Sequence, residues 1–81
     1  MKIMVVIPIE QYNAFLSKVE SSRPECQILK NGVITRSEDG AKVVEIACDL
    51  QTVERLLDLA ARVYAGAAAA IQESIRVSRE L

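Results

Sequence analysis

"YAGAAAAIQ", residues 64–72, is the stretch that decides how the C-terminal half of the chain folds. Alanine is the best helix former, whereas a glycine inside a helix costs roughly 1 kcal/mol relative to alanine. Apolar residues recur with helical periodicity from residue 50 to residue 80, and Asp49 stands where an N-cap residue is needed. The stretch around Gly66 therefore decides whether residues 50–80 form one helix or two.

A single helix over residues 50–80 would be about 45 Å long, which exceeds the roughly 30 Å diameter of a globule of this size. Either the helix breaks near Gly66, or its last turns extend beyond the monomer and are buried by another chain. The apolar stripe continues past Gly66 without a proline or a capping residue, so the sequence favours one long helix. The residues expected at the contact with another chain are Tyr64, Ala67, Ala68, Ile71 and Ile75.

The alanine run itself admits two interpretations. Small side chains let a second backbone approach closely, which predicts a helix crossing between two copies of the protein. The alternative is that alanine is present only because it favours helix, with no contact at all.

The N-terminal part begins with an apolar, β-branched run that predicts a strand over residues 2–8, ended by Pro8. Both faces of this strand are apolar, which predicts that it is covered on both sides. Residues 9–21 then place four apolar side chains on one helical stripe and predict a helix. The stripe consists of Tyr12, Phe15, Leu16 and Val19.

Two turn dipeptides, Asn31-Gly32 and Asp39-Gly40, divide the middle of the chain. Either both are turns and three short strands form a meander, or Gly32 is a bulge within one strand. We favour a strand over residues 27–36 that pairs with a strand over residues 42–48, because the meander would leave an unusually short first strand.

These elements predict one α+β domain over residues 1–81, a β-α-β-β-α two-layer sandwich with a long C-terminal helix. The order resembles the ferredoxin-like plan lacking its last strand, a resemblance of fold that carries no function. In that plan the missing strand leaves one edge of the first strand open, and helices on one side leave the second face of the sheet bare. Both features predict a homodimer or a higher homo-oligomer.

The sequence contains few residues of the kinds that carry out catalysis or bind metals and cofactors. Its net charge is −1, it has no histidine, and Cys26 and Cys48 lack the spacing of redox or zinc sites. No glycine-rich phosphate loop is present, so we expect no catalytic residue, no cofactor, no metal and no nucleic-acid partner. The thiols are expected to be buried and unpaired. The apolar run at residues 3–7 is too short to span a bilayer, which predicts no membrane partner and a cytoplasmic location.

Three hypotheses about function follow. The favoured one is a small homo-oligomeric protein-interaction or assembly module without catalytic activity, with itself and possibly another protein as partner. The alternative is a small-molecule-binding regulatory domain with its ligand site at the subunit interface, near Tyr64 or the Pro8-Ile9 turn. A cysteine-dependent enzyme is the third, and it would need an exposed thiol with a lowered pKa.

Overall fold

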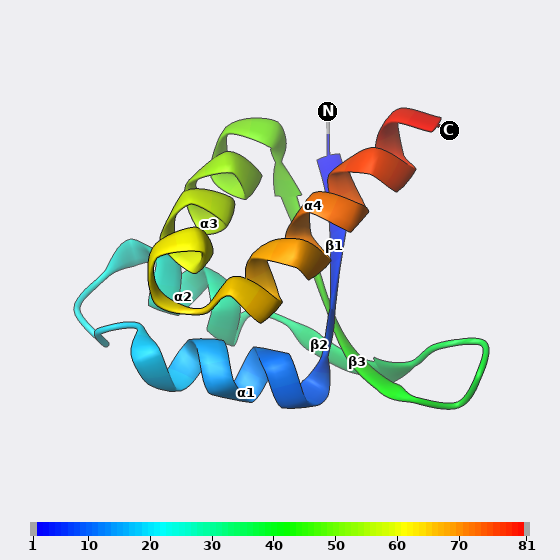
Figure 1. The fold of residues 1–81 in the computed structure, drawn as a ribbon, viewed down its shortest axis with the longest axis horizontal. Helices are drawn as coiled ribbons and strands as arrows, with labels where there is room; N and C mark the ends of the chain where they lie inside the picture. Colours follow the sequence, from blue (N-terminus) through cyan, green and yellow to red (C-terminus); the bar gives the residue numbers. More distant parts are fainter. Residues whose placement is uncertain (1, 81) are drawn as a thin grey trace.

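A computed structural model describes residues 2–80 as an α+β fold with a three-stranded antiparallel sheet and helices (Figure 1). In chain order its elements are β1 (Lys2–Pro8), α1 (Ile9–Lys18), α2 (Pro24–Lys30), β2 (Val33–Arg36), β3 (Lys42–Asp49), α3 (Leu50–Val63) and α4 (Ala65–Glu80).

The first strand and helix follow the sequence pattern closely. β1 covers the predicted residues and ends at Pro8, and α1 begins at the next residue. α1 stops three residues earlier than predicted, because Val19 is extended, with φ −98° and ψ 127°. The side chain of Val19 is buried, so the chain leaves the helix while still packing on the core.

The predicted strand over residues 27–36 is wrong in its first half, which belongs to helix α2. Pro24 occupies the first turn of α2, where its missing N–H costs nothing, and Cys26 and Leu29 are buried one turn apart. Gly32 is not a bulge. Its N–H donates to the carbonyl oxygen of Leu29 at 3.1 Å, and a Cβ at this position would overlap Val44 Cγ1. Gly32 therefore ends the turn that follows α2, at a place too tight for a side chain.

The second predicted turn is confirmed. Gly40 has φ +87°, a conformation that L side chains rarely adopt, and the Ser37 N–H donates to the Ala41 carbonyl at 2.9 Å across the hairpin. β2 pairs with β3 in an antiparallel register that sets Val33 opposite Glu45.

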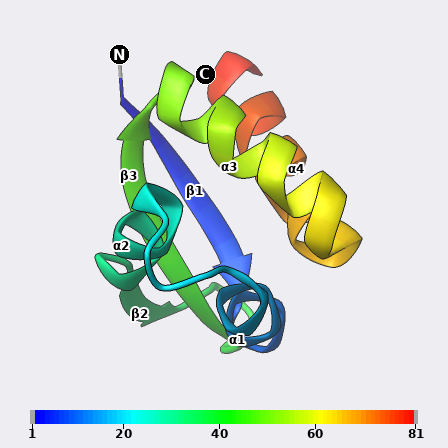
Figure 2. The same ribbon diagram turned by 90° about the vertical axis from the view of Figure 1, so that its left-hand side faces the viewer.

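The sheet has the strand order β1-β3-β2, so β3 is central and β2 is an edge strand. α3 and α4 lie side by side along β1, as Figure 2 shows. All four helices contribute to one buried cluster with the inner face of the sheet. The inner-face residues in this cluster are Ile3, Val5, Ile7, Val44, Ile46 and Cys48.

The C-terminal region contains a long helix, α4, but residues 50–80 do not form one continuous helix. Asp49 caps α3 as predicted, accepting a hydrogen bond from the Thr52 N–H at 2.9 Å. The helix ends at Val63, since Tyr64 is extended, with φ −158° and ψ 94°. Figure 1 shows the chain reversing there, so that α4 runs back beside β1 and finishes at the same end of the molecule as the N-terminus.

The reversal explains the small residues around it. The Tyr64 carbonyl accepts the N–H of Ala67 at 3.1 Å and so starts α4, and the Tyr64 ring lies 3.1 Å from the position of a Cβ on Gly66. Ala60 of α3 and Ala67 of α4 are both fully buried in the core. The expectation that the helix overshoots its own domain is therefore wrong, because breaking the helix lets the monomer bury both halves of the apolar stripe.

Candidate interaction surface

β1 buries only one of its two apolar faces. Ile3, Val5 and Ile7 face the core, whereas Met4 is 48% exposed and Val6 is 36% exposed. The prediction that this strand is covered on both sides is therefore wrong for the isolated chain. The prediction that helices on one side leave the second face bare agrees with the structure.

The uncovered residues of β1 belong to a mostly apolar face of the sheet. The strand registers place Met4 opposite Ala47, Val6 opposite Glu45, and Glu45 opposite Val33. We call this the open face. It consists of Met4, Val6, Pro8, Val33, Val43 and Ala47, of which Val43 is buried, with Glu45 and Thr35 among them.

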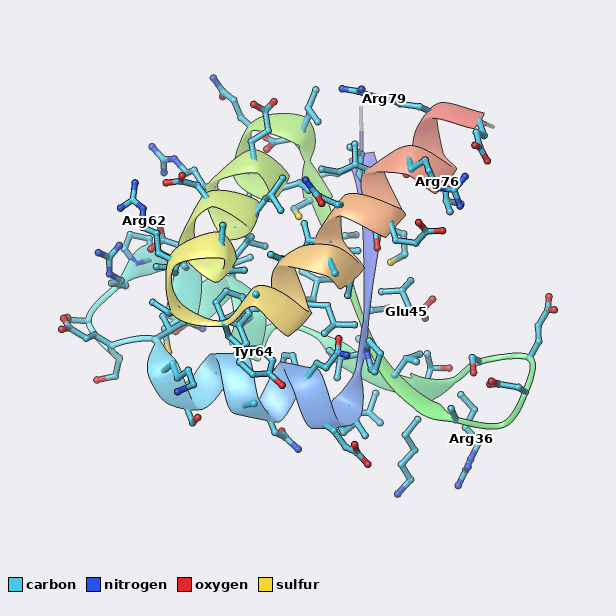
Figure 3. All side chains as sticks on the ribbon, in the orientation of Figure 1. Arg36, Glu45, Arg62, Tyr64, Arg76 and Arg79 are labelled. Atoms are coloured by element: carbon cyan, nitrogen blue, oxygen red, sulfur yellow. The ribbon has the colours of Figure 1, made fainter. Side chains whose placement is uncertain are left out.

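Glu45 interrupts the open face with a negative charge. It stands on the central strand, flanked by Val6 and Val33, and its side chain is half-buried. Figure 3 shows Glu45 projecting on the opposite side of β1 from α3. Among residues 2–80 no salt bridge reaches its carboxylate. Stacking this face on an identical face would bury two unpaired carboxylates, which costs several kcal/mol per ion.

The outer edge of β1 is not open, contrary to the expectation from the missing fourth strand. Ser74 of α4, which is 7% exposed, accepts the Val6 N–H through its Oγ at 3.0 Å and donates to the Ala70 carbonyl at 3.0 Å. The hydroxyl thus replaces one hydrogen bond that a neighbouring strand would have made. α4 protects this edge from pairing with another chain.

A shallow groove lies between α4 and the exposed side of β1. Its volume is about 450 Å³ and its walls are mainly apolar, with a carboxylate and hydroxyls around them. We call it the β1–α4 groove. It is lined by Met4, Val6, Pro8, Val43, Ala70, Glu73, Ser74, Val77 and Ser78.

The free edge of the sheet is β2. Val33 and Ile34 are 64% and 63% exposed, the highest values among the exposed large apolar residues. Their side chains point to opposite faces of the sheet, as successive residues of a strand do. Arg36, at the end of β2, donates to the Gly40 carbonyl at 2.8 Å, so its charge is held at the hairpin turn (Figure 3).

The five residues predicted to contact another chain lie mostly inside this one. Ala67 and Ile71 are fully buried in the core. Tyr64, Ala68 and Ile75 are half-buried and pack against it. The Tyr64 ring in Figure 3 points from the α3–α4 connection towards α1. The structure brings these residues into one core and leaves Ala67 and Ile71 no exposed surface for a partner.

The residues that the sequence did not single out are Met4, Val33, Ile34 and Val77, which are all exposed. One signal was available for Met4, since β1 has two apolar faces and a small domain has helices to cover only one. The predicted plan placed the second strand at a sheet edge, but Val33 and Ile34 were assigned to the interior of a longer strand and did not stand out within it.

The polar chemistry among residues 2–80 is sparse. Cys26 and Cys48 are buried and unpaired, and burial raises the pKa of the Cys48 thiol, which opposes thiolate formation. Within that range no group of three or more histidine, cysteine, aspartate or glutamate residues could hold a metal ion. No described helix has the length and apolar composition needed to cross a membrane.

Comparisons of the chain with protein-family models, with curated proteins and with solved structures give no significant match. The surface geometry and the packing are therefore the grounds on which a function can be proposed.

Proposed function

We propose that the chain is a small protein-interaction module without catalytic activity, which associates with a second copy of itself through β2. One observation carries the proposal. Among residues 2–80, Val33 and Ile34 are the most exposed large apolar residues, and they follow each other on an edge strand, one on each face of the sheet. An exposed apolar edge strand is a ready template for pairing with another chain.

The composition of the open face favours contact through β2 over face-to-face stacking of two open faces. Glu45 stands in its centre without an ion pair among the described residues, so face-to-face stacking of two copies would desolvate two carboxylates. Contact through β2 leaves Glu45 in water. The covered edge of β1 likewise leaves β2 as the edge available for pairing.

The association we propose is weak. Burying a valine or isoleucine completely is worth about 1.5 to 3 kcal/mol, and these two side chains are already one-third covered. Two of them from each chain therefore offer roughly 4 to 7 kcal/mol before the cost of association. The cost of association is of similar size, so the dimer also depends on backbone hydrogen bonds between the paired strands, and we expect it to form only at high micromolar to millimolar concentration.

The fold is consistent with a ferredoxin-like plan that lacks its last strand, which we propose as its classification. The strand order β1-β3-β2 matches that plan, and α4 lies along the edge of β1 where the last strand would pair. The two buried, unpaired cysteines support the further proposal of a cytoplasmic, reducing location.

The test is the native mass of three proteins at about 500 μM, where an association of this strength is populated. The double variant Val33→Ser/Ile34→Ser should have the mass of a monomer, while the average mass of the unaltered chain should lie clearly above 8.9 kDa and approach twice that value. Val77→Ser is the matched control, because Val77 is also exposed and lies on α4 away from β2. A dimer in which only Val77→Ser dissociates would refute contact through β2.

A second candidate function rests on the β1–α4 groove. Its apolar walls and its volume of about 450 Å³ fit a small apolar ligand, and Pro8, near which the sequence predicted a pocket, lines it. A short-chain fatty alcohol is a suitable probe. Binding in the groove should raise the thermal unfolding temperature of the unaltered chain and not that of Val77→Glu, whereas equal shifts in both proteins would exclude the groove.

A further inference from the structure

β2 offers unpaired backbone groups as well as apolar side chains. The Ser37 N–H bonds the Ala41 carbonyl at 2.9 Å, and residues of an antiparallel pair alternate between bonded and non-bonded positions. Val33 and Thr35 therefore direct their N–H and C=O groups towards β3. Ile34 and Arg36 direct theirs away from the sheet.

The same alternation holds on the other side of the sheet, where it can be checked. There the Val6 N–H points away from β3 and is bonded by Ser74 of α4. No described helix packs extensively on β2, whose main contact is with β3. The outward groups of Ile34 and Arg36 are thus available to another strand.

β2 is short, but it has few other features that keep edge strands from pairing. It contains no proline, and no bulge interrupts its register with β3 from Val33 to Arg36. Its one charged residue is Arg36, whose guanidinium is bonded to the turn. The edge is short but unprotected.

A second copy can pair with this edge around a two-fold axis in three registers that use the outward groups. Centring the axis on Arg36 sets two like charges opposite each other, which is destabilising. Centring it on Thr35 sets Ile34 opposite the partner's Arg36. Centring it on Ile34 sets the two isoleucines opposite each other, Val33 opposite the partner's Thr35, and Arg36 opposite the partner's Gly32. The last register joins apolar side chains and separates the arginines.

We propose that β2 pairs antiparallel with β2 of a second copy, with Ile34 at the two-fold axis. The inference rests on the proposed self-association and assigns its geometry. The product is a six-stranded sheet in which the two open faces become continuous. Lys30 precedes β2 and Glu38 follows it, so the antiparallel direction brings Lys30 of each copy towards Glu38 of the other. Both residues are exposed, and their charges are opposite.

The occupant is a second copy, because in this register the edge complements itself: Ile34 meets the partner's Ile34, and exposed Lys30 faces the partner's Glu38. The pairing also closes on itself. A two-fold contact uses the same edge in both chains, and it stops at two unless another edge is free. The remaining edge belongs to β1, where Ser74 occupies the Val6 N–H and α4 lies alongside. The arrangement therefore predicts a closed dimer and no fibre.

The test is Ile34→Pro, with Ile34→Val as the matched control. Proline removes the outward N–H of residue 34 and leaves the bonds from β2 to β3 in place, since those come from Val33 and Thr35. Valine keeps both the N–H and the β-branched side chain. We expect the unaltered chain and Ile34→Val to be dimers by light scattering, and Ile34→Pro to be a monomer with an unchanged circular dichroism spectrum.

The other outcomes are also decisive. A dimeric Ile34→Pro protein would overturn the strand pairing and leave self-association standing. A monomeric unaltered chain at about 500 μM would overturn both proposals. Should Ile34→Pro fail to fold, Ile34→Lys replaces it, because two lysines at the axis repel each other. Continued dimerisation of Ile34→Lys would then refute the pairing.

Discussion

Ser74→Ala removes the hydroxyl that bonds the outer edge of β1. The Val6 N–H then loses its acceptor at 3.0 Å, and the Ala70 carbonyl loses a donor at 3.0 Å. A donor left without a partner in a mostly buried setting costs about 1 to 3 kcal/mol. Ser74 is 7% exposed but Val6 is 36% exposed, so we expect the lower half of that range. Alanine has a higher helix propensity than serine, which offsets roughly 0.5 kcal/mol of this loss. The net loss in free energy of unfolding should be about 1 kcal/mol.

The assay is urea unfolding followed by circular dichroism, with amide hydrogen exchange at Val6 as a second readout. A loss of about 1 kcal/mol lowers the urea midpoint by roughly 0.5 to 1 M for a domain of this size. Ser78→Ala is the matched control, since it changes the same residue type one turn further along α4 and leaves the Val6–Ser74 bond intact. We expect Val6 exchange to accelerate in Ser74→Ala only. Equal midpoints and equal Val6 exchange in the two variants would refute the role given to Ser74.

Two further substitutions test the fold. Gly32→Ala should lower the free energy of unfolding by about 1 to 3 kcal/mol, because the new Cβ overlaps Val44 Cγ1 and lies 3.1 Å from Ile46 Cγ1; a urea midpoint equal to that of the unaltered chain would contradict this packing. Asp49→Asn tests the cap of α3. Hydrogen bonding by Thr52, from its side chain and then its backbone, lowers the pKa of Asp49 below its usual 3.8, so the carboxylate stabilises the fold above that pH and the contribution disappears as the pH falls through the lowered pKa. Thermal unfolding from pH 6 to pH 2 should therefore show a steeper acid loss in the unaltered chain than in Asp49→Asn, and parallel curves would remove the cap from the account.

Where local signals act alone, the fold could be predicted from the sequence. Pro8 ends β1, Asp49 caps α3, and Asp39-Gly40 makes the hairpin turn. Each of these depends on a few neighbouring residues with fixed conformational preferences. The pairing of β1 with the third strand also agrees with the plan drawn from the order of elements.

The errors arise where packing between distant segments decides the conformation. The strand predicted over residues 27–36 overlaps α2, which begins at Pro24 and brings Cys26 and Leu29 to the core one turn apart. Proline in the first turn followed by an apolar i, i+3 pair was the available signal.

The break at Tyr64 lies two residues before Gly66, the local signal for a break, but the apolar stripe is continuous across it. Both halves of the stripe pack on the same core once the chain reverses, so the periodicity of the sequence is the same for one helix or two. A continuous helix over residues 50–80 would be longer than the domain, so the helix had to break or to extend beyond the monomer. Helix length alone does not determine whether Ile71 is buried by its own chain or by a second one. In the structure its own chain buries it completely.

The proposed contact lies on β2 and not on the C-terminal helix for the same reason. With Ala67 and Ile71 in the core, the large apolar residues that are exposed between residues 2 and 80 are those of the sheet and Val77. Their exposure depends on strand order and on which face the helices cover, and neither is encoded in any short stretch of the chain.

Self-association is the central claim, and the native mass of the unaltered chain tests it most directly. Light scattering over a hundredfold dilution, from about 1 mM to about 10 μM, covers the range expected for a contact of this size. We predict an average mass clearly above 8.9 kDa and approaching twice that value at the highest concentration, and a reversible decline towards 8.9 kDa on dilution. A mass of 8.9 kDa at every concentration would contradict the claim and leave β2 without a partner of its own kind.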